Sequence, residues 1–240
     1  PCNADEIIKG GTGYDINSTL PDKIEHIYPD YSLYPQHTQD TAYGFLSRGC
    51  PRGCDFCLVA AKEGKQSKKV ADLSEWWRGQ KNIILMDPNI LACRDHKGLL
   101  MQLVDSKAWI DINQGLDARL LTHENIDLIN KVKLKEIHFA WDSIKDTKAI
   151  IRGLELYKDG ATRHPHGAYG TVYVLTNFDS NAEEDLYRIY MLRDMGYNPY
   201  VMIYDKPNAP KHIRQLQRWC NNRRIFRSEP DFEKYMNGAG

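Results

Sequence analysis

The chain has 240 residues, of which 42% are apolar and 27% are charged, as in an ordinary globular protein. Lys plus Arg and Asp plus Glu both number 32, and this zero net charge argues against a protein whose main task is to grip phosphate backbones. No apolar run is long enough to span a bilayer and no signal peptide is recognisable, so we expect no membrane partner. Six cysteines in such a chain indicate reduced thiols and predict a cytoplasmic location.

Residues 1–40 differ from the rest of the chain. Pro21, Pro29 and Pro35 lie among several tyrosines, and prolines at this density argue against a regular helix or a central strand. We predict an extended arm that packs on a domain surface. Because the chain begins with Pro1 rather than Met, we interpret it as a piece of a longer protein, with residues 1–40 as an extension or a remnant of an upstream domain.

From residue 41 onward, strand patterns alternate with helical patterns, which implies parallel strands joined by right-handed crossovers. Six such units favour an α/β fold with a partial (β/α)6 TIM-like barrel over residues 41–240. A doubly wound open sheet is the alternative, which periodicity alone does not separate. The expected strands span 41–47, 82–87, 109–115, 136–142, 170–178 and 199–205, and the expected helices span 71–79, 96–108, 122–133, 145–160, 180–196 and 209–222.

Three cysteines lie in one loop, RGCPRGCDFC, directly after the first predicted strand. In parallel α/β folds, the carboxyl end of a strand is where chemistry takes place. The thiolates of Cys50, Cys54 and Cys57 can hold three irons of a four-iron cluster and leave the fourth iron open to a small molecule. The alternative is structural zinc with a fourth ligand such as Cys93 or His96. Zinc knuckles usually offer two paired halves and no second CxxC occurs, which favours the cluster.

This CxxxCxxC loop, followed by a βα series, resembles the radical SAM superfamily over about residues 41–205. The resemblance implies that Cys50, Cys54 and Cys57 hold a [4Fe–4S] cluster whose open iron binds S-adenosyl-L-methionine. A reductant such as flavodoxin or ferredoxin would then trigger cleavage of a carbon–sulfur bond, and the resulting 5′-deoxyadenosyl radical would abstract hydrogen from a substrate. The substrate and the substrate-specific catalytic residues are not indicated. Phe56, just before the last cysteine, would lie beside the adenine.

The resemblance also places cofactor contacts at the carboxyl ends of the second and third strands. The second strand of the family is often followed by Gly-Gly-Glu, which meets the methionine ammonium, whereas this chain has LMDPNIL. There Asp87 and Asn89 can accept the same hydrogen bonds, or Asp87 only caps a turn. After the third strand, Gln114, Asp117 and Arg119 suit ribose hydroxyls, an ammonium or a carboxylate. The alternative is an ordinary Asp–Arg surface pair.

The fourth strand ends in FAWDSIKD, where Asp142 and Ser143 match the acidic residue and serine that the family commonly has near the ribose. The alternative is that one of them only caps the next helix. A second function class also stays open for the whole chain. It is a non-catalytic zinc-binding module that recognises nucleic acid or protein through the basic run 62–69. The neutral total charge does not indicate a nucleic acid partner.

Overall fold

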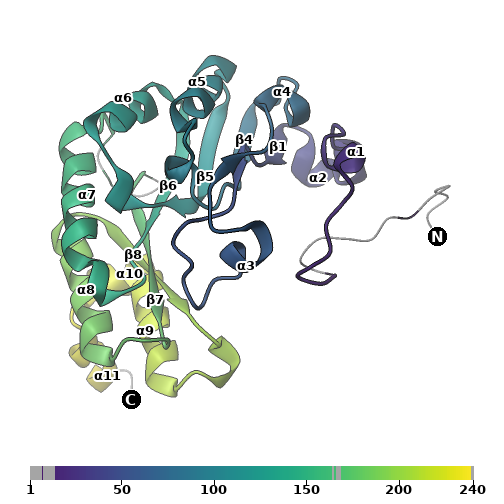
Figure 1. Cartoon of the computed structure of the whole chain (residues 1–240). Coiled ribbons are helices and arrows are strands. Elements are labelled where there is room, and N and C mark those ends of the chain that lie inside the picture. The colour runs from purple at the N-terminus through teal and green to yellow at the C-terminus, as the bar shows by residue number, and fades with distance from the viewer. Residues whose placement is uncertain (1–6, 8–13, 164, 166–168, 239–240) are drawn as a thin grey trace.

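A six-stranded sheet forms the centre of the computed structural model, which describes residues 7, 14–163, 165 and 169–238 (Figure 1). Every pair of neighbouring strands in this sheet is parallel, and the order β1-β4-β5-β6-β7-β8 follows the order of the chain. A doubly wound sheet reverses its strand order at a switch point, and this sheet has no such reversal. The strands are Thr41–Gly44 (β1), Asn82–Leu85 (β4), Trp109–Leu116 (β5), Leu134–Ala140 (β6), Thr171–Thr176 (β7) and Asn198–Ile203 (β8).

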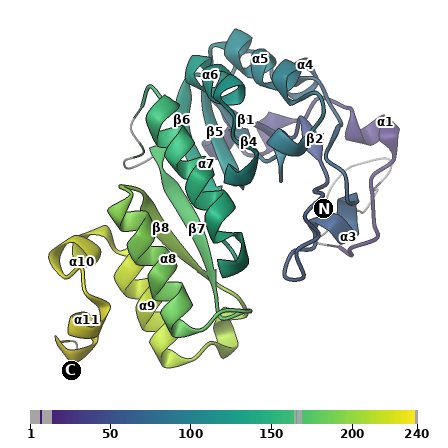
Figure 2. The ribbon, with the colours of Figure 1, turned by 60° about the vertical axis from the view of Figure 1, so that its left-hand side comes forward.

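Helices connect the strands, and right-handed crossovers in a sheet of this order place successive helices on one face. Figures 1 and 2 show the longer helices along the outer side of the sheet. No helix within the described ranges is long and apolar enough to cross a bilayer. The helices from the first crossover onward are Val59–Glu63 (α3), Leu73–Trp76 (α4), His96–Ser106 (α5), His123–Lys131 (α6), Thr147–Gly160 (α7), Ala182–Asp194 (α8), Lys211–Asn221 (α9), Arg223–Ser228 (α10) and Phe232–Gly238 (α11).

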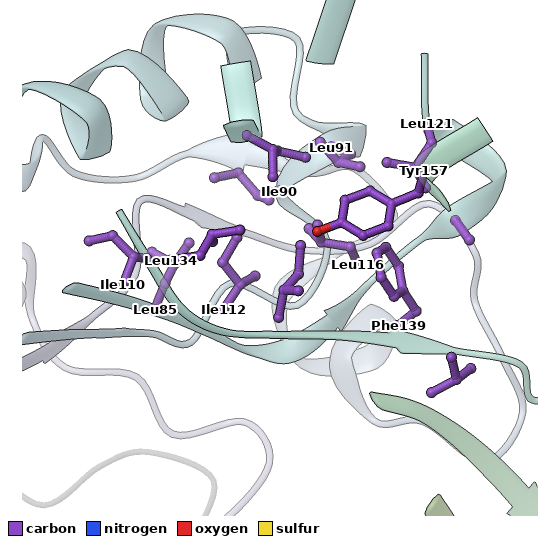
Figure 3. Close-up of a cluster of buried hydrophobic side chains, with 14 of the residues drawn as sticks. Leu85, Ile90, Leu91, Ile110, Ile112, Leu116, Leu121, Leu134, Phe139 and Tyr157 are labelled. Carbon is purple, nitrogen blue, oxygen red and sulfur yellow. The ribbon is translucent and has the colours of Figure 1, made fainter. Parts of the chain in front are cut away.

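The hydrophobic core lies between the sheet and these helices. Figure 3 shows Leu116 of β5 near Phe139 of β6 and Tyr157 of α7, with Ile112 and Ile110 farther along the cluster, and all of these side chains are buried. Buried and partly buried positions alternate in β1, in β4 and in the first four residues of β5, whereas β7 is buried at nearly every position. A parallel sheet covered on both faces has continuous apolar strands. This alternation therefore leaves the second face of the sheet without a comparable apolar cover.

The N-terminal arm, residues 14–40, packs on the domain as predicted, but it is not wholly extended. It contains single turns at Asp22–Glu25 (α1), Tyr31–Leu33 (η1) and Pro35–Thr38 (α2). The prediction is wrong on this point because a proline ring fits the first turn of a helix and blocks only later positions. The Tyr31 hydroxyl holds the arm in place through hydrogen bonds to the carbonyl oxygens of Tyr43 (3.1 Å) and Trp76 (2.9 Å).

Candidate functional site

The three-cysteine loop runs from β2 (Ser47–Arg48) to α3, after the first strand of the sheet. Its course is fixed by backbone contacts: Cys50 N–H donates to the Gly64 carbonyl (3.1 Å) and Cys57 N–H to the Cys54 carbonyl (2.9 Å). Gly49 has a φ of 84°, and a Cβ there would lie 2.3 Å from the Gln66 carbonyl oxygen. Only glycine fits this close approach. All three loop cysteines are free thiols and are partly buried.

The spacing of the three thiols is wider than one small ion requires. Among the described residues, the one group of three His, Cys, Asp or Glu ligand atoms within 4.8 Å of one another is Asp111, Glu136 and His138. The loop sulfurs therefore do not all meet this limit. A tetrahedral zinc ion with Zn–S bonds of about 2.3 Å would hold its sulfurs about 3.8 Å apart.

Cys93 and His96, the two residues considered as a fourth zinc ligand, have contacts of their own. Cys93 is 3% exposed and belongs to the hydrophobic core. Nδ1 of His96 lies 2.8 Å from the Cys93 carbonyl oxygen. Cys220 is also buried, and the sixth cysteine, Cys2, lies outside the described residues.

The electrostatic environment of Cys54 favours the neutral thiol. Burial raises the pKa of this thiol, and the nearby charges of Asp142, Cys50 and Cys57 raise it further. Arg119 acts in the opposite direction. Three negatively charged thiolates can lie together at this partly buried place when a cation such as a metal ion neutralises their charge.

Asp117 joins the loop to the end of β5. Its Oδ2 accepts from Nε of Arg52 (2.6 Å) and its Oδ1 from Nε of Arg119 (2.7 Å). Arg119 also donates to Asp146 (2.5 Å). Burial alone would raise the pKa of Asp117, but the hydrogen bonds and charges of Arg119 and Arg52 outweigh it and hold this pKa below its usual value. The Asp117–Arg119 pair lies just beyond β5, and its buried Asp117 carboxylate also anchors the cysteine loop through Arg52.

Asn89 lies between Cys50 and Asp117. Its Nδ2 lies 3.6 Å from the Cys50 sulfur and 3.4 Å from Oδ2 of Asp117, and its backbone carbonyl accepts from the Ser67 hydroxyl (2.9 Å). The side chain is buried, and its Oδ1 has no hydrogen-bond partner among the described residues. Such an orphaned acceptor is costly to bury. A bound ligand with a hydrogen-bond donor could satisfy the Oδ1 atom of Asn89.

Asp87 is occupied by the chain itself. Its carboxylate accepts from the N–H groups of Leu46 (2.8 Å) and Ser47 (2.6 Å) and from the Ser47 hydroxyl (2.5 Å). Burial raises its pKa to about 6, although these hydrogen bonds partly oppose the shift. Asp87 thus fixes Leu46 and Ser47, which lie just before Cys50 in the chain. Asp87 therefore does more than cap its own turn, because its hydrogen bonds reach Leu46 and Ser47, far away in the chain.

Asp142 and Ser143 differ in whether their side chains already have hydrogen-bond partners among the described residues. The Ser143 oxygen accepts from Lys145 N–H (3.4 Å) and caps the 3-10 turn Ile144–Asp146, which directly precedes α7. The Asp142 side chain makes no hydrogen bond to the described residues. Burial raises its pKa to about 6, while Arg188 and Arg119 lower it. Asp142 is therefore a carboxyl group beside Cys54 that is available to a ligand.

Gln114 lies inside β5 rather than after it, because that strand extends to Leu116. The pairing with β6 shifts register between Ile112 and Leu116, and the Gln114 side chain is exposed within this irregularity. The structure therefore separates Gln114 from Asp117 and Arg119, which lie beyond the strand end. Its assignment to the cofactor stays a prediction.

Phe56 is placed by a chain of aromatic rings. It meets Phe178 edge to face at 5.5 Å between centroids, and Phe178 meets Tyr204 at 4.9 Å. Phe178 and Tyr204 follow β7 and β8, so the cysteine loop contacts the carboxyl ends of β5 and β7. The sequence did not indicate Arg52 and Phe178 as site residues, because their partners Asp117 and Phe56 lie far away in the chain.

Arg188 is a further residue that the sequence did not single out. It is fully buried in α8 and pairs with Asp185 at 2.6 Å. Its guanidinium also donates to the carbonyl oxygens of Trp141 and Leu175, each at 2.8 Å. Arg188 thus fixes the ends of β6 and β7 next to Asp142.

Comparison with known proteins gave no assignment. No protein-family model matches this chain. No curated protein matches it significantly either. Function must therefore be inferred from the residues and contacts of this chain.

Proposed function

We propose that this chain is an iron–sulfur enzyme that binds S-adenosyl-L-methionine and belongs to the radical SAM superfamily. The observation that carries the proposal is the CxxxCxxC loop, which follows the first strand and is tied by Arg52 to Asp117 at the end of β5. This arrangement lies at the edge of a parallel sheet where ligands bind.

We further propose that the sheet is a partial barrel with the cofactor at its carboxyl end. A strand order that follows the chain, together with helices along one face, supports this architecture. The half-buried, partly polar positions on the other face suit the inside of an open barrel. The loop contacts through Asp117 and Phe178 would close its rim.

The residues around the loop fit these groups. Cys50, Cys54 and Cys57 would hold a [4Fe–4S] cluster, which offsets the burial and mutual repulsion of the thiolates. The orphaned Oδ1 of Asn89, next to Cys50, would accept a hydrogen bond from the ammonium group of S-adenosyl-L-methionine. Asp142 offers a second free acceptor.

When bound, the reduced cluster and its ligand supply a 5′-deoxyadenosyl radical for hydrogen abstraction. The residues of the chain would position the cysteine loop and exclude water from the site. Asp87 holds the chain just before the cysteine loop, Arg52 holds the middle of the loop, and Phe56 packs against Phe178 over the end of β7. Aromatic cover at this place would keep water from a reactive species.

Anaerobic reconstitution tests the proposal. We expect the intact chain to bind about four irons and four sulfides and to show a paramagnetic signal after reduction with dithionite. Cys54→Ser should lose the cluster, whereas Cys93→Ala, a matched change in the core, should keep it. Stoichiometric zinc without iron after anoxic expression would instead support the zinc-binding module.

Formation of 5′-deoxyadenosine separates an active enzyme from a chain that keeps the cluster only for structure. We expect the reduced, loaded chain to release it from S-adenosyl-L-methionine even without the natural substrate. A chain that holds the cluster but binds no S-adenosyl-L-methionine would contradict the proposed reaction.

A further inference from the structure

Asp111, Glu136 and His138 bring three ligand atoms together within the sheet. Nε2 of His138 lies 3.6 Å from Oδ1 of Asp111 and 3.5 Å from Oε2 of Glu136. All three ligand atoms lie within 4.8 Å of one another. Asp111 comes from β5 and the other two from β6, so the cluster lies in strand interiors and shares no residue with the three-cysteine loop.

Two register shifts between β5 and β6 build this cluster. Ile110 pairs with Leu134, but the next residue, Asp111, pairs with Glu136, so Lys135 is the extra residue of a bulge. The second shift lies between Ile112 and Leu116. Bulges re-aim side chains and occur next to functional sites. Here the first one puts Glu136 opposite Asp111.

The polar atoms of the cluster lack hydrogen bonds. His138 is 8% exposed, its Nδ1 is buried without a hydrogen-bond partner among the described residues, and its Nε2 lies near the two carboxylates. Oδ1 of Asp111 is also buried without such a partner. The separations of 3.5 and 3.6 Å exceed the usual 2.7–3.2 Å of a hydrogen bond. His138 is thus a buried polar side chain aimed at two carboxylates without bonding them.

Among the described residues, the ion-pair partner of both carboxylates is His138, which carries a charge only when it is protonated. Within the described residues, neither Asp111 nor Glu136 forms an ion pair with Lys or Arg. The Tyr173 ring stacks on His138 at 5.2 Å between ring centroids. The Asp111 side chain is 15% exposed and that of Glu136 is 41% exposed, so Asp111 carries the more buried charge, and a buried charge is normally paired or bound to a metal.

We propose that Asp111, Glu136 and His138 form a binding site for a first-row divalent cation of the zinc type. Metal–ligand bonds of about 2.0–2.2 Å at tetrahedral angles put ligand atoms about 3.4 Å apart, close to the separations found here. One imidazole and two carboxylates suit Zn²⁺, Mn²⁺ or Fe²⁺ and balance a double positive charge. Three protein ligands leave a coordination position for water or an oxygen of a substrate.

Metal titration of the full chain tests this site. Because the cysteine loop also binds metals, the sample is the Cys50→Ser/Cys54→Ser/Cys57→Ser variant, stripped with a chelator and titrated with Co²⁺ and Zn²⁺ by calorimetry. We expect one equivalent to bind. The bound Co²⁺ should show ligand-field absorption without thiolate charge-transfer bands. This readout does not depend on the proposed cluster or on activity.

Substitutions assign the bound ion to the cluster. Asp111→Asn keeps the side-chain shape and should weaken Zn²⁺ binding more than about tenfold. Glu136→Gln, which is closer to solvent, should do the same if Asp111→Asn does not fold. Glu155→Gln, an exposed acid on α7, is the matched control and should bind as the parent does. The proposal is overturned if the folded parent binds no stoichiometric metal or if the folded cluster variant binds it undiminished.

Discussion

Arg52 and Asp117 are joined by a 2.6 Å hydrogen bond between Nε and Oδ2, although 65 positions separate them in the chain. Arg52 belongs to the three-cysteine loop, and Asp117 is buried at the end of β5. The carboxylate is held in turn by Arg119. The position of the cysteines thus depends on a strand that lies two places away from β1 in the sheet.

Replacing Arg52 by Ala should loosen this loop without unfolding the domain. The Arg52 side chain is 33% exposed and Asp117 keeps Arg119, so we expect a loss of about 1 kcal/mol in the free energy of unfolding. Iron bound after reconstitution should fall more clearly, because the cysteines lose their tie to β5. Urea unfolding and iron analysis measure the two effects. Arg94 is exposed and forms no ion pair with the described residues, so Arg94→Ala should change neither.

Gly153 of α7 is a second point on which the site depends. A Cβ at this position would lie 1.9 Å from the carbonyl oxygen of Ala118, the residue between Asp117 and Arg119. Gly153→Ala should therefore displace this turn and lower the free energy of unfolding by roughly 2–3 kcal/mol, as overpacking does. Thermal unfolding measures the change.

Gly98→Ala is the matched control, since Gly98 also lies within a helix. A Cβ there would meet only the tip of the exposed Asp95 side chain, at 2.8 Å, and that side chain can move. Alanine forms helices better than glycine by about 1 kcal/mol, so this variant should be as stable as the parent or more stable. Equal destabilisation by both substitutions would contradict the close contact at Gly153.

Asp87 should make stability depend on pH. Burial raises its pKa from 3.8 to about 6 in the folded chain, so the folded state holds this proton more tightly than the unfolded state. The resulting stabilisation is fully present below the unfolded pKa and is lost as the pH rises through about 6. A shift of this size corresponds to about 3 kcal/mol.

The Asp87→Asn variant isolates this effect, because other carboxyl groups titrate in the same range. We expect the difference in unfolding free energy, parent minus variant, to fall by up to about 3 kcal/mol between about pH 4 and pH 7. Urea unfolding at several pH values measures it. A constant difference would show that Asp87 does not titrate as its burial requires.

The alternation of strands and helices was predictable from the sequence because its signals are local. Thr122 begins α6 with a capping box, and β7 spans 171–176 within the predicted 170–178. The parallel pairing followed from this alternation. The position of the cysteine loop after the first strand followed as well.

The contacts that build the site were not predictable, because they join residues far apart in the chain. Arg188 has the sequence context of an exposed helix residue, yet it is fully buried between strand ends. Likewise, Asp111 and His138 each lie in an ordinary strand pattern, and only the register shifts between β5 and β6 bring them together. A bulge leaves no mark in hydrophobic periodicity.

Asn89 and Ser143 provide the sharpest test of how the cofactor is held. Both were predicted as cofactor contacts, but the Ser143 oxygen caps its own turn, whereas Oδ1 of Asn89 is buried without a partner. Asn89→Ala should therefore weaken binding of S-adenosyl-L-methionine to the reconstituted chain by about tenfold, the value of a hydrogen bond to a charged group. Ser143→Ala should leave this affinity unchanged. Equilibrium binding under anoxic conditions measures both, with iron content as the check that the cluster is retained. Equal affinity in the two variants would remove Asn89 from the cofactor site and leave Asp142 as the acceptor beside the loop.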